Sequence, residues 1–241
     1  MQPTVDDFRA LARSSPWRWT TLHFRHRSGF GGTCEAWVRR PGRLLVRRPT
    51  GEEHYVSGVP YSISRVMVAR SPEWVETVER RPEPEEPVLR PDGLVASRPA
   101  DWYLEHSDPM WGSYSWPAML DPDELSHHVE VSDLRVVEVA GRPAWRADLR
   151  AQLGYLPRCG GNCCDLILSE AGLRADFPEP DDVPESLRGR IYPDHYDVAL
   201  DVQTGVVVRC LPVGGAEGAS WLENDILEVD EDVDAIFVGR A

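Results

Sequence analysis

The segment from His195 to Val202 alternates between apolar residues and polar or small ones. Its apolar members are Tyr196, Val198, Leu200 and Val202. A period of two is typical of a β-strand with one buried face. The Gln203–Gly205 turn follows, and two more apolar runs cover 206–211 and 221–229. These runs predict an antiparallel meander, which specifies an architecture and leaves the chemistry open.

The same signals recur along most of the chain. Further strands are predicted at 17–26, 34–39, 44–48, 53–57, 61–70, 134–139 and 143–149. A bulge is expected near Thr20, where the apolar phase of the first strand shifts. An amphipathic helix is predicted from Thr4, which caps it, to Ser14, and a second helix is expected to start at Asp121.

Two stretches interrupt this rhythm. Residues 79–91 are rich in proline and glutamate and predict an exposed loop, and residues 153–192 form a loop-rich insertion that contains cysteines. The sequence shows no internal repeat and no linker between two cores. We therefore expect a single mainly β domain over residues 1–241.

The composition limits the function classes. The formal charge is −14, and all 26 basic residues are arginine. A net acidic chain lacks the basic footprint of non-specific nucleic-acid binding, so no nucleic-acid partner is expected. No apolar run approaches the roughly 20 residues of a membrane-spanning helix. The N-terminal sequence lacks the pattern of a signal peptide, which predicts a cytoplasmic protein.

The charge is unevenly distributed. Residues 1–50 carry ten arginines against Asp6, Asp7 and Glu35, whereas residues 165–241 carry five arginines against eighteen acidic residues. One interpretation is an Arg-rich face that docks an acidic protein partner. The other is that the two ends of one domain lie together and neutralise each other.

The order of the pieces resembles one family. An N-terminal amphipathic helix is followed by the Trp17-x-Trp19 pair and the strand Glu35–Gly42. Then come Ser115–Leu125, a hairpin at Gly141 and Arg142, and the Tyr196–Gly205 strand and turn. This arrangement is similar to actinobacterial proteins related to the lipoprotein-carrier (LolA-like) family.

The resemblance implies a strongly curved, unclosed antiparallel half-barrel with a few short helices on its concave face. It also implies an apolar ligand or lipid held in that face, and it suggests export from the cytoplasm. Related modules sense envelope lipids and bind anti-sigma factors, so a protein segment is the other occupant that the resemblance implies.

The cysteines form the sharpest local cluster. Cys159, Cys163 and Cys164 lie within six residues, followed by Asp165. With His195 and Cys210 they could supply the nitrogen and sulfur ligands of a zinc ion. The spacing lacks paired Cys-x2-Cys knuckles, so a disulfide and free buried thiols remain alternatives.

The tryptophan content gives the remaining indication of function. Nine tryptophans are many for this length, and five of them are candidates to line an apolar ligand pocket: Trp17, Trp19, Trp37, Trp74 and Trp145. The alternative is that they fill the core. No nucleophile elbow, metalloprotease motif, phosphate loop or dinucleotide fingerprint occurs. We therefore predict a non-catalytic binding protein, with an interaction module or a Cys-cluster metal protein as alternatives.

Overall fold

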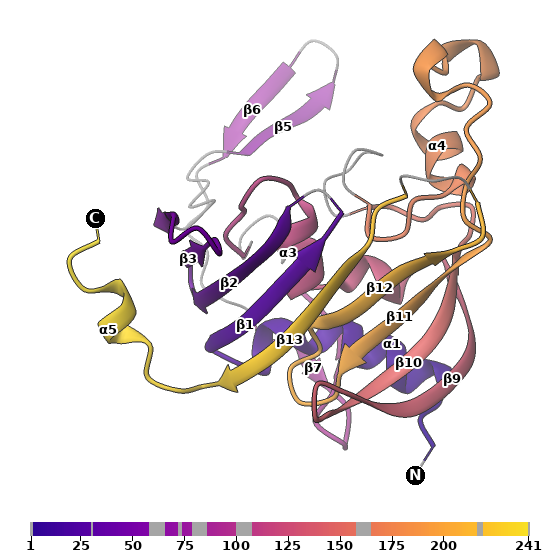
Figure 1. Cartoon of the computed structure of the whole chain (residues 1–241). Helices are drawn as coiled ribbons and strands as arrows, with labels where there is room; N and C mark the ends of the chain where they lie inside the picture. Colours follow the sequence, from indigo (N-terminus) through magenta and orange to yellow (C-terminus); the bar gives the residue numbers. More distant parts are fainter. Residues whose placement is uncertain are drawn as a thin grey trace.

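The computed structural model describes residues 2–29, 31–57, 66–71, 74–78, 86–99, 108–157, 165–215 and 219–240, and of 66–71 and 74–78 it describes the backbone alone. One antiparallel sheet joins nine strands from both ends of the chain. Their order is β4 (Glu53–Ser57), β3 (Arg43–Arg47), β2 (Gly32–Arg39), β1 (Thr21–Ser28), β13 (Leu222–Val229), β12 (Val207–Val213), β11 (His195–Asp201), β10 (Arg142–Ala151) and β9 (Val129–Val139). The sheet is curved and its two edges do not meet (Figure 1).

Two small hairpins accompany this sheet. They pair β5 (Val66–Ser71) with β6 (Trp74–Val78), and β7 (Val88–Leu89) with β8 (Val95–Ser97). The helices of the described chain are short: α1 (Val5–Ser14), α3 (Ser115–Leu120), α4 (Glu170–Asp176) and α5 (Asp234–Phe237), with 3-10 turns at Ser15–Trp17, Asp123–Ser126, Pro180–Asp182 and Glu185–Leu187. None of these helices is long and apolar enough to cross a membrane. The predicted fold class, a mainly β chain with one curved open sheet and few short helices, is confirmed.

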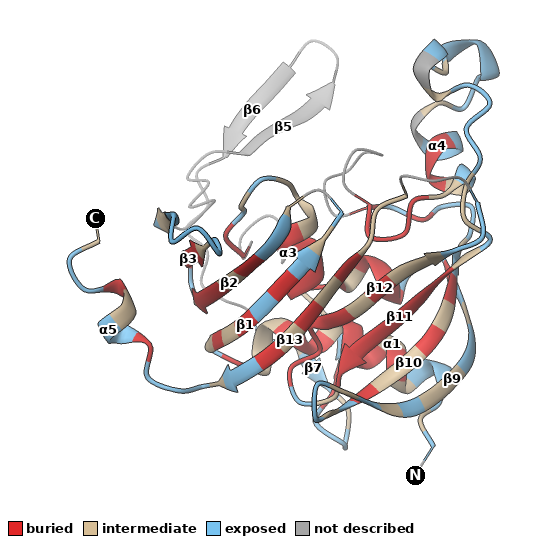
Figure 2. Ribbon diagram, viewed as in Figure 1, coloured by how far each residue is buried: buried red, intermediate tan, exposed pale blue. Residues whose placement is uncertain are grey.

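The period-two pattern of β11 marks the face that meets the core, although Asp197, Ala199 and Asp201 on the other face are also buried. On β11, Tyr196, Val198 and Leu200 face inward and are fully or almost fully buried. Helix α1 packs against this concave face with Phe8 and Leu11, both 0% exposed. Figure 2 shows the buried residues gathered where strands β10 to β13 curve over α1.

Helix α1 begins as the sequence predicts. The Thr4 side chain accepts a hydrogen bond from the Asp7 backbone N–H, and the Asp7 carboxylate accepts one from the Thr4 backbone. This reciprocal capping box satisfies two of the N–H groups that a helix start leaves unpaired.

Several local predictions are wrong. The strand predicted at 17–26 begins only at Thr21, because Ser15–Trp17 form a 3-10 turn, and Val88–Leu89 of the loop predicted at 79–91 form strand β7. Residues 61–65 and 79–85 of the predicted segments lie outside the described residues. The helix expected to start at Asp121 lies before that residue, as α3, and only a 3-10 turn follows it. The Asp121 carboxylate binds the guanidinium of Arg98 in a buried ion pair instead of capping a helix. The strand bulge lies between His23 and Phe24, where β1 pairs with β13, and not near Thr20.

Candidate functional site

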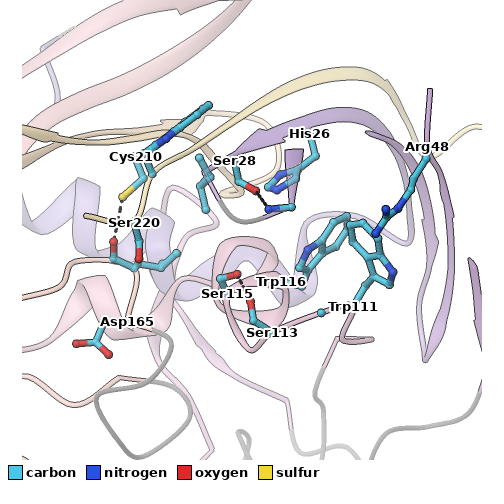
Figure 3. Close-up of a pocket in the computed structure, with 15 residues that line it drawn as sticks. His26, Ser28, Arg48, Trp111, Ser113, Ser115, Trp116, Asp165, Cys210 and Ser220 are labelled. Carbon is cyan, nitrogen blue, oxygen red and sulfur yellow. Dashed lines mark hydrogen bonds between the residues drawn. The ribbon is translucent and has the colours of Figure 1, made fainter. Parts of the chain in front are cut away.

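The helices leave one end of the concave face open as a pocket of about 420 Å³. Its apolar lining comes from separate parts of the chain: Trp111, Trp116, Leu166, Cys210, Trp221 and Leu222. Its polar lining consists of His26, Ser28, Arg48, Ser113, Ser115, Asp165 and Ser220 (Figure 3). The pocket forms because β1 pairs with β13, which brings the N-terminal strand beside the C-terminal meander.

Two indoles form an aromatic corner in this pocket. The rings of Trp111 and Trp116 meet edge to face, with centroids 5.3 Å apart and planes at 89°. Trp116 is buried and also lies 5.8 Å from the Phe24 ring, whereas Trp111 is half-buried. The Arg48 guanidinium stands 5.5 Å from the centroid of Trp111. Perpendicular aromatic faces offer an apolar ligand two flat surfaces to contact.

His26 is the buried titratable side chain beside this corner. It is 3% exposed, and its ring lies 5.0 Å from that of Trp116. Its Nδ1 is 2.8 Å from Oδ1 of Asn224, which is itself 1% exposed. Burial lowers the pKa of His26 below its ordinary value, and the hydrogen bond to Asn224 opposes that shift.

The nucleophile candidates in the pocket are not activated. The Cys210 thiol donates to the Leu166 carbonyl at 3.2 Å, and burial raises its pKa far above the ordinary range. A thiol that stays protonated is a poor nucleophile. The Ser28 hydroxyl accepts a hydrogen bond from the Gly31 N–H at 3.0 Å. In the described part of the chain, neither the Cys210 thiol nor the Ser28 hydroxyl bonds to His26.

Glu124 binds the backbone at Leu166, one of the residues that line the pocket. Its Oε1 accepts hydrogen bonds from the Tyr155 hydroxyl at 2.5 Å and from the Leu166 backbone N–H at 2.9 Å. Desolvation and the neighbouring carboxylate raise the pKa of Tyr155 well above its ordinary value. This buried network holds the chain at Leu166 against the core.

The sequence-predicted tryptophans lie elsewhere. Trp19 is buried with the Arg40 guanidinium 3.3 Å from its ring centroid, and Trp17 lies in the 3-10 turn after α1, 5.4 Å from the Arg98 guanidinium. Trp145 is half-buried against the core opposite Leu200.

The other two candidates are also away from the pocket lining. Trp37 packs on the convex face of the sheet beside Leu45, and the side chain of Trp74 lies outside the described residues. None of the four described candidates lines the pocket. Their ligand-binding role stays a prediction.

The proposed zinc ligands are only partly described. Cys159, Cys163 and Cys164 lie outside the described residues. Cys210 pairs with the inward-facing Val198, whereas His195 lies on the other face of the sheet, 3.6 Å from Asp148. No group of three metal-ligating side chains converges among the described residues, and the zinc site stays a prediction.

Two arginines of the first strands, Arg27 and Arg39, lie beside carboxylates from the end of the chain. Arg27 lies 3.6 Å from Glu223 and 3.4 Å from Asp225, both on the neighbouring strand β13. Arg39 pairs with Asp234 at 2.5 Å. These pairs agree with the neutralisation of the two chain ends, whereas Arg47 and Arg48 pair with the nearby Glu53 and Glu52. The basic docking face stays a prediction.

The aromatic residues that do line the pocket were not chosen from the sequence. Trp111 and Trp116 belong to an aromatic-rich stretch, and Trp221 precedes the last strand of the meander. The density of aromatic residues around 111–116 was the available signal. Their convergence with His26 depends on the pairing of distant strands, which no local pattern shows.

No family model and no curated protein matches this chain. Among solved structures, the chain is similar to one described as the complex structure of Pseudomonas aeruginosa MucA/MucB, with 14% identity and a TM-score of 0.41 over 98% of this chain and 61% of that one. A crystal structure of MucB gives 13% identity and a TM-score of 0.35 over 98% of this chain and 63% of that one. The chain thus spans about three fifths of the length of these proteins. Scores this low carry no conclusion about family or function.

Proposed function

We propose that this chain is a non-catalytic binding protein that holds a small apolar or amphipathic molecule in the pocket at the end of the concave face. One observation carries the proposal. The fold fills most of that face with its own side chains from α1 and α3, yet leaves a space of about 420 Å³ lined by tryptophans. Ligand pockets typically measure about 300 to 1,000 Å³ and are mostly apolar with a few polar groups.

The chemistry of the lining favours binding over catalysis. Burial keeps the Cys210 thiol protonated, and Nδ1 of His26 hydrogen-bonds to the amide of Asn224 rather than to a nucleophile. Catalysis by a nucleophile requires a base within hydrogen-bond reach of it. Among the described residues, neither Cys210 nor Ser28 forms such a hydrogen bond with His26.

The dimensions favour a small molecule over a protein segment. The pocket measures about 420 Å³, and its lining comes from β1, β12, β13, the α3 region and the chain at Asp165 and Leu166 (Figure 3). Two of its lining residues, Trp116 and Leu222, belong to the buried core. A lipid or another apolar compound would therefore enter with one part of its structure only.

Native mass spectrometry of the protein purified from its source tests the proposal. We expect a non-covalent adduct that disappears when the protein is denatured. The Trp111→Leu variant should lose the adduct, because Trp111 forms one wall of the pocket. Trp145→Leu is the matched control, since this residue is also half-buried but lies outside the lining. A wild-type protein with no adduct, or a loss of adduct in Trp145→Leu alone, would contradict the proposal.

A further inference from the structure

The orientation of the Asn224 side chain is fixed by two acceptors. Its amide nitrogen donates to the Val207 carbonyl at 2.6 Å and approaches the Met119 sulfur at 3.4 Å. A rotated amide would place its oxygen against the Val207 carbonyl, which offers no hydrogen. The amide oxygen therefore faces His26, and it lies 2.8 Å from the ring Nδ1.

This orientation determines the tautomer of His26. An amide oxygen only accepts hydrogen bonds, so Nδ1 must carry the proton of the neutral ring. Nε2 then keeps a free lone pair and acts as an acceptor. The neutral form is the favoured one, because His26 is 3% exposed and desolvation disfavours its charged form.

Nε2 of His26 lies toward the pocket. A β-carbon placed on Gly31, another lining residue, would be 4.0 Å from this nitrogen. The nitrogen has no hydrogen-bond partner within the described ranges of the chain. Figure 3 shows the His26 ring beside the indole of Trp116.

The other polar groups near His26 already have partners. The Ser28 hydroxyl accepts from Gly31, and the hydroxyls of Ser113 and Ser115 bond to each other at 2.6 Å. Arg48 is half-exposed and lies 3.8 Å from Glu52. Nε2 of His26 is thus an acceptor beside the aromatic corner that has no partner among the described residues.

We infer that the pocket selects an apolar molecule that carries a hydroxyl or N–H group, which donates a hydrogen bond to Nε2 of His26. This inference rests on the proposed function, since it names the ligand class of the same pocket. An ether or ester of equal shape would leave Nε2 buried and without a partner. A buried acceptor that loses its partner carries a desolvation penalty.

Two probes of the same shape test this inference: 2-naphthol, which donates a hydrogen bond, and 2-methoxynaphthalene, which does not. We expect the wild-type protein to bind 2-naphthol about tenfold more tightly, the effect of one buried hydrogen bond. Tryptophan fluorescence titration measures both affinities. Two variants, each checked for folding by circular dichroism, assign the effect to a single ring nitrogen.

His26→Asn keeps a donor for Asn224 near the place of Nδ1 and leaves no acceptor at the position of Nε2, so the preference for 2-naphthol should vanish. His26→Gln places an amide oxygen near the position of Nε2, so the preference should persist. Equal wild-type affinities, or a preference that survives in His26→Asn, would overturn the inference and leave the pocket intact. Binding of neither probe by the wild-type protein would overturn the proposed function and this inference together.

Discussion

Burial decides the chemistry of the key residue, His26. The side chain sits between Asn224 and the indole of Trp116, where a charged ring would be poorly solvated. Its pKa is therefore lower in the folded protein than the ordinary value of 6.5. The unfolded chain takes up a proton at this residue at a higher pH than the folded chain does.

This difference predicts a pH-dependent stability. As the pH falls below about 6.5, the unfolded state binds a proton that the folded state excludes, so the free energy of unfolding decreases by up to about 1.4 kcal/mol per pH unit from this residue. The decrease ends once the pH passes below the folded-state pKa. Urea unfolding at several pH values between 7.5 and 5 measures it. His26→Asn should lack this component, and identical pH profiles for the wild type and the variant would refute the account.

Among the structural elements, the turn between β11 and β12 both reverses the chain and packs against helix α1. Gly205 has a φ of +74°, and a β-carbon there would lie 2.8 Å from the Leu11 carbonyl of α1. The turn of the meander therefore packs directly on the helix that fills the concave face. A glycine is required both for the backbone conformation and for this close approach.

The Gly205→Ala and Gly141→Ala variants separate these two requirements. Gly141 has a similar φ of +79° but nothing within 4 Å of its β-carbon position. Gly141→Ala should cost about 1 kcal/mol for the positive φ alone, and Gly205→Ala should cost at least about 1 kcal/mol more because α1 must move. Denaturant unfolding of both variants gives the difference. Equal decreases in the free energy of unfolding of the two variants would show that the turn does not pack closely against α1.

The elements could be predicted where apolar and polar residues alternate along a strand or where a capping motif marks a helix start. The alternation at 195–202 and the capping box at Thr4 are local, so the sequence displayed them. The helix at Asp121 was mispredicted because its carboxylate is used in tertiary structure, by Arg98. A capping residue and a buried ion-pair partner look the same in a sequence.

In the whole molecule, the two faces of the sheet carry different structures. The concave face holds the core and the pocket, whereas the convex face carries a separate apolar cluster in which Phe237 of α5 and Val233 cover Trp37 and Leu45. The site itself was beyond sequence reasoning, because it requires β1 to lie beside β13 across some 200 residues of chain. Tryptophan content predicted an aromatic pocket, but neighbours on the sheet decide which indoles face it.

Because the convex cluster and the pocket lie on opposite faces of the sheet, we expect a substitution in the cluster to change stability without changing ligand affinity. Phe237→Ala should lower the free energy of unfolding by about 3 kcal/mol through the loss of buried apolar surface. Its affinity for 2-naphthol should remain that of the wild type, because the pocket lies on the opposite face. Urea unfolding and fluorescence titration measure the two effects. A weaker affinity in this variant would show that the convex cluster supports the pocket.

Fluorine NMR of the protein labelled with 5-fluorotryptophan, titrated with 2-naphthol, tests the central claim most directly. Single tryptophan substitutions assign the signals. The account predicts shifts at Trp111, Trp116 and Trp221, which line the pocket, and unchanged signals at Trp17, Trp37 and Trp145. Shifts confined to this second group, or no shift at any tryptophan, would contradict a ligand site at the open end of the concave face.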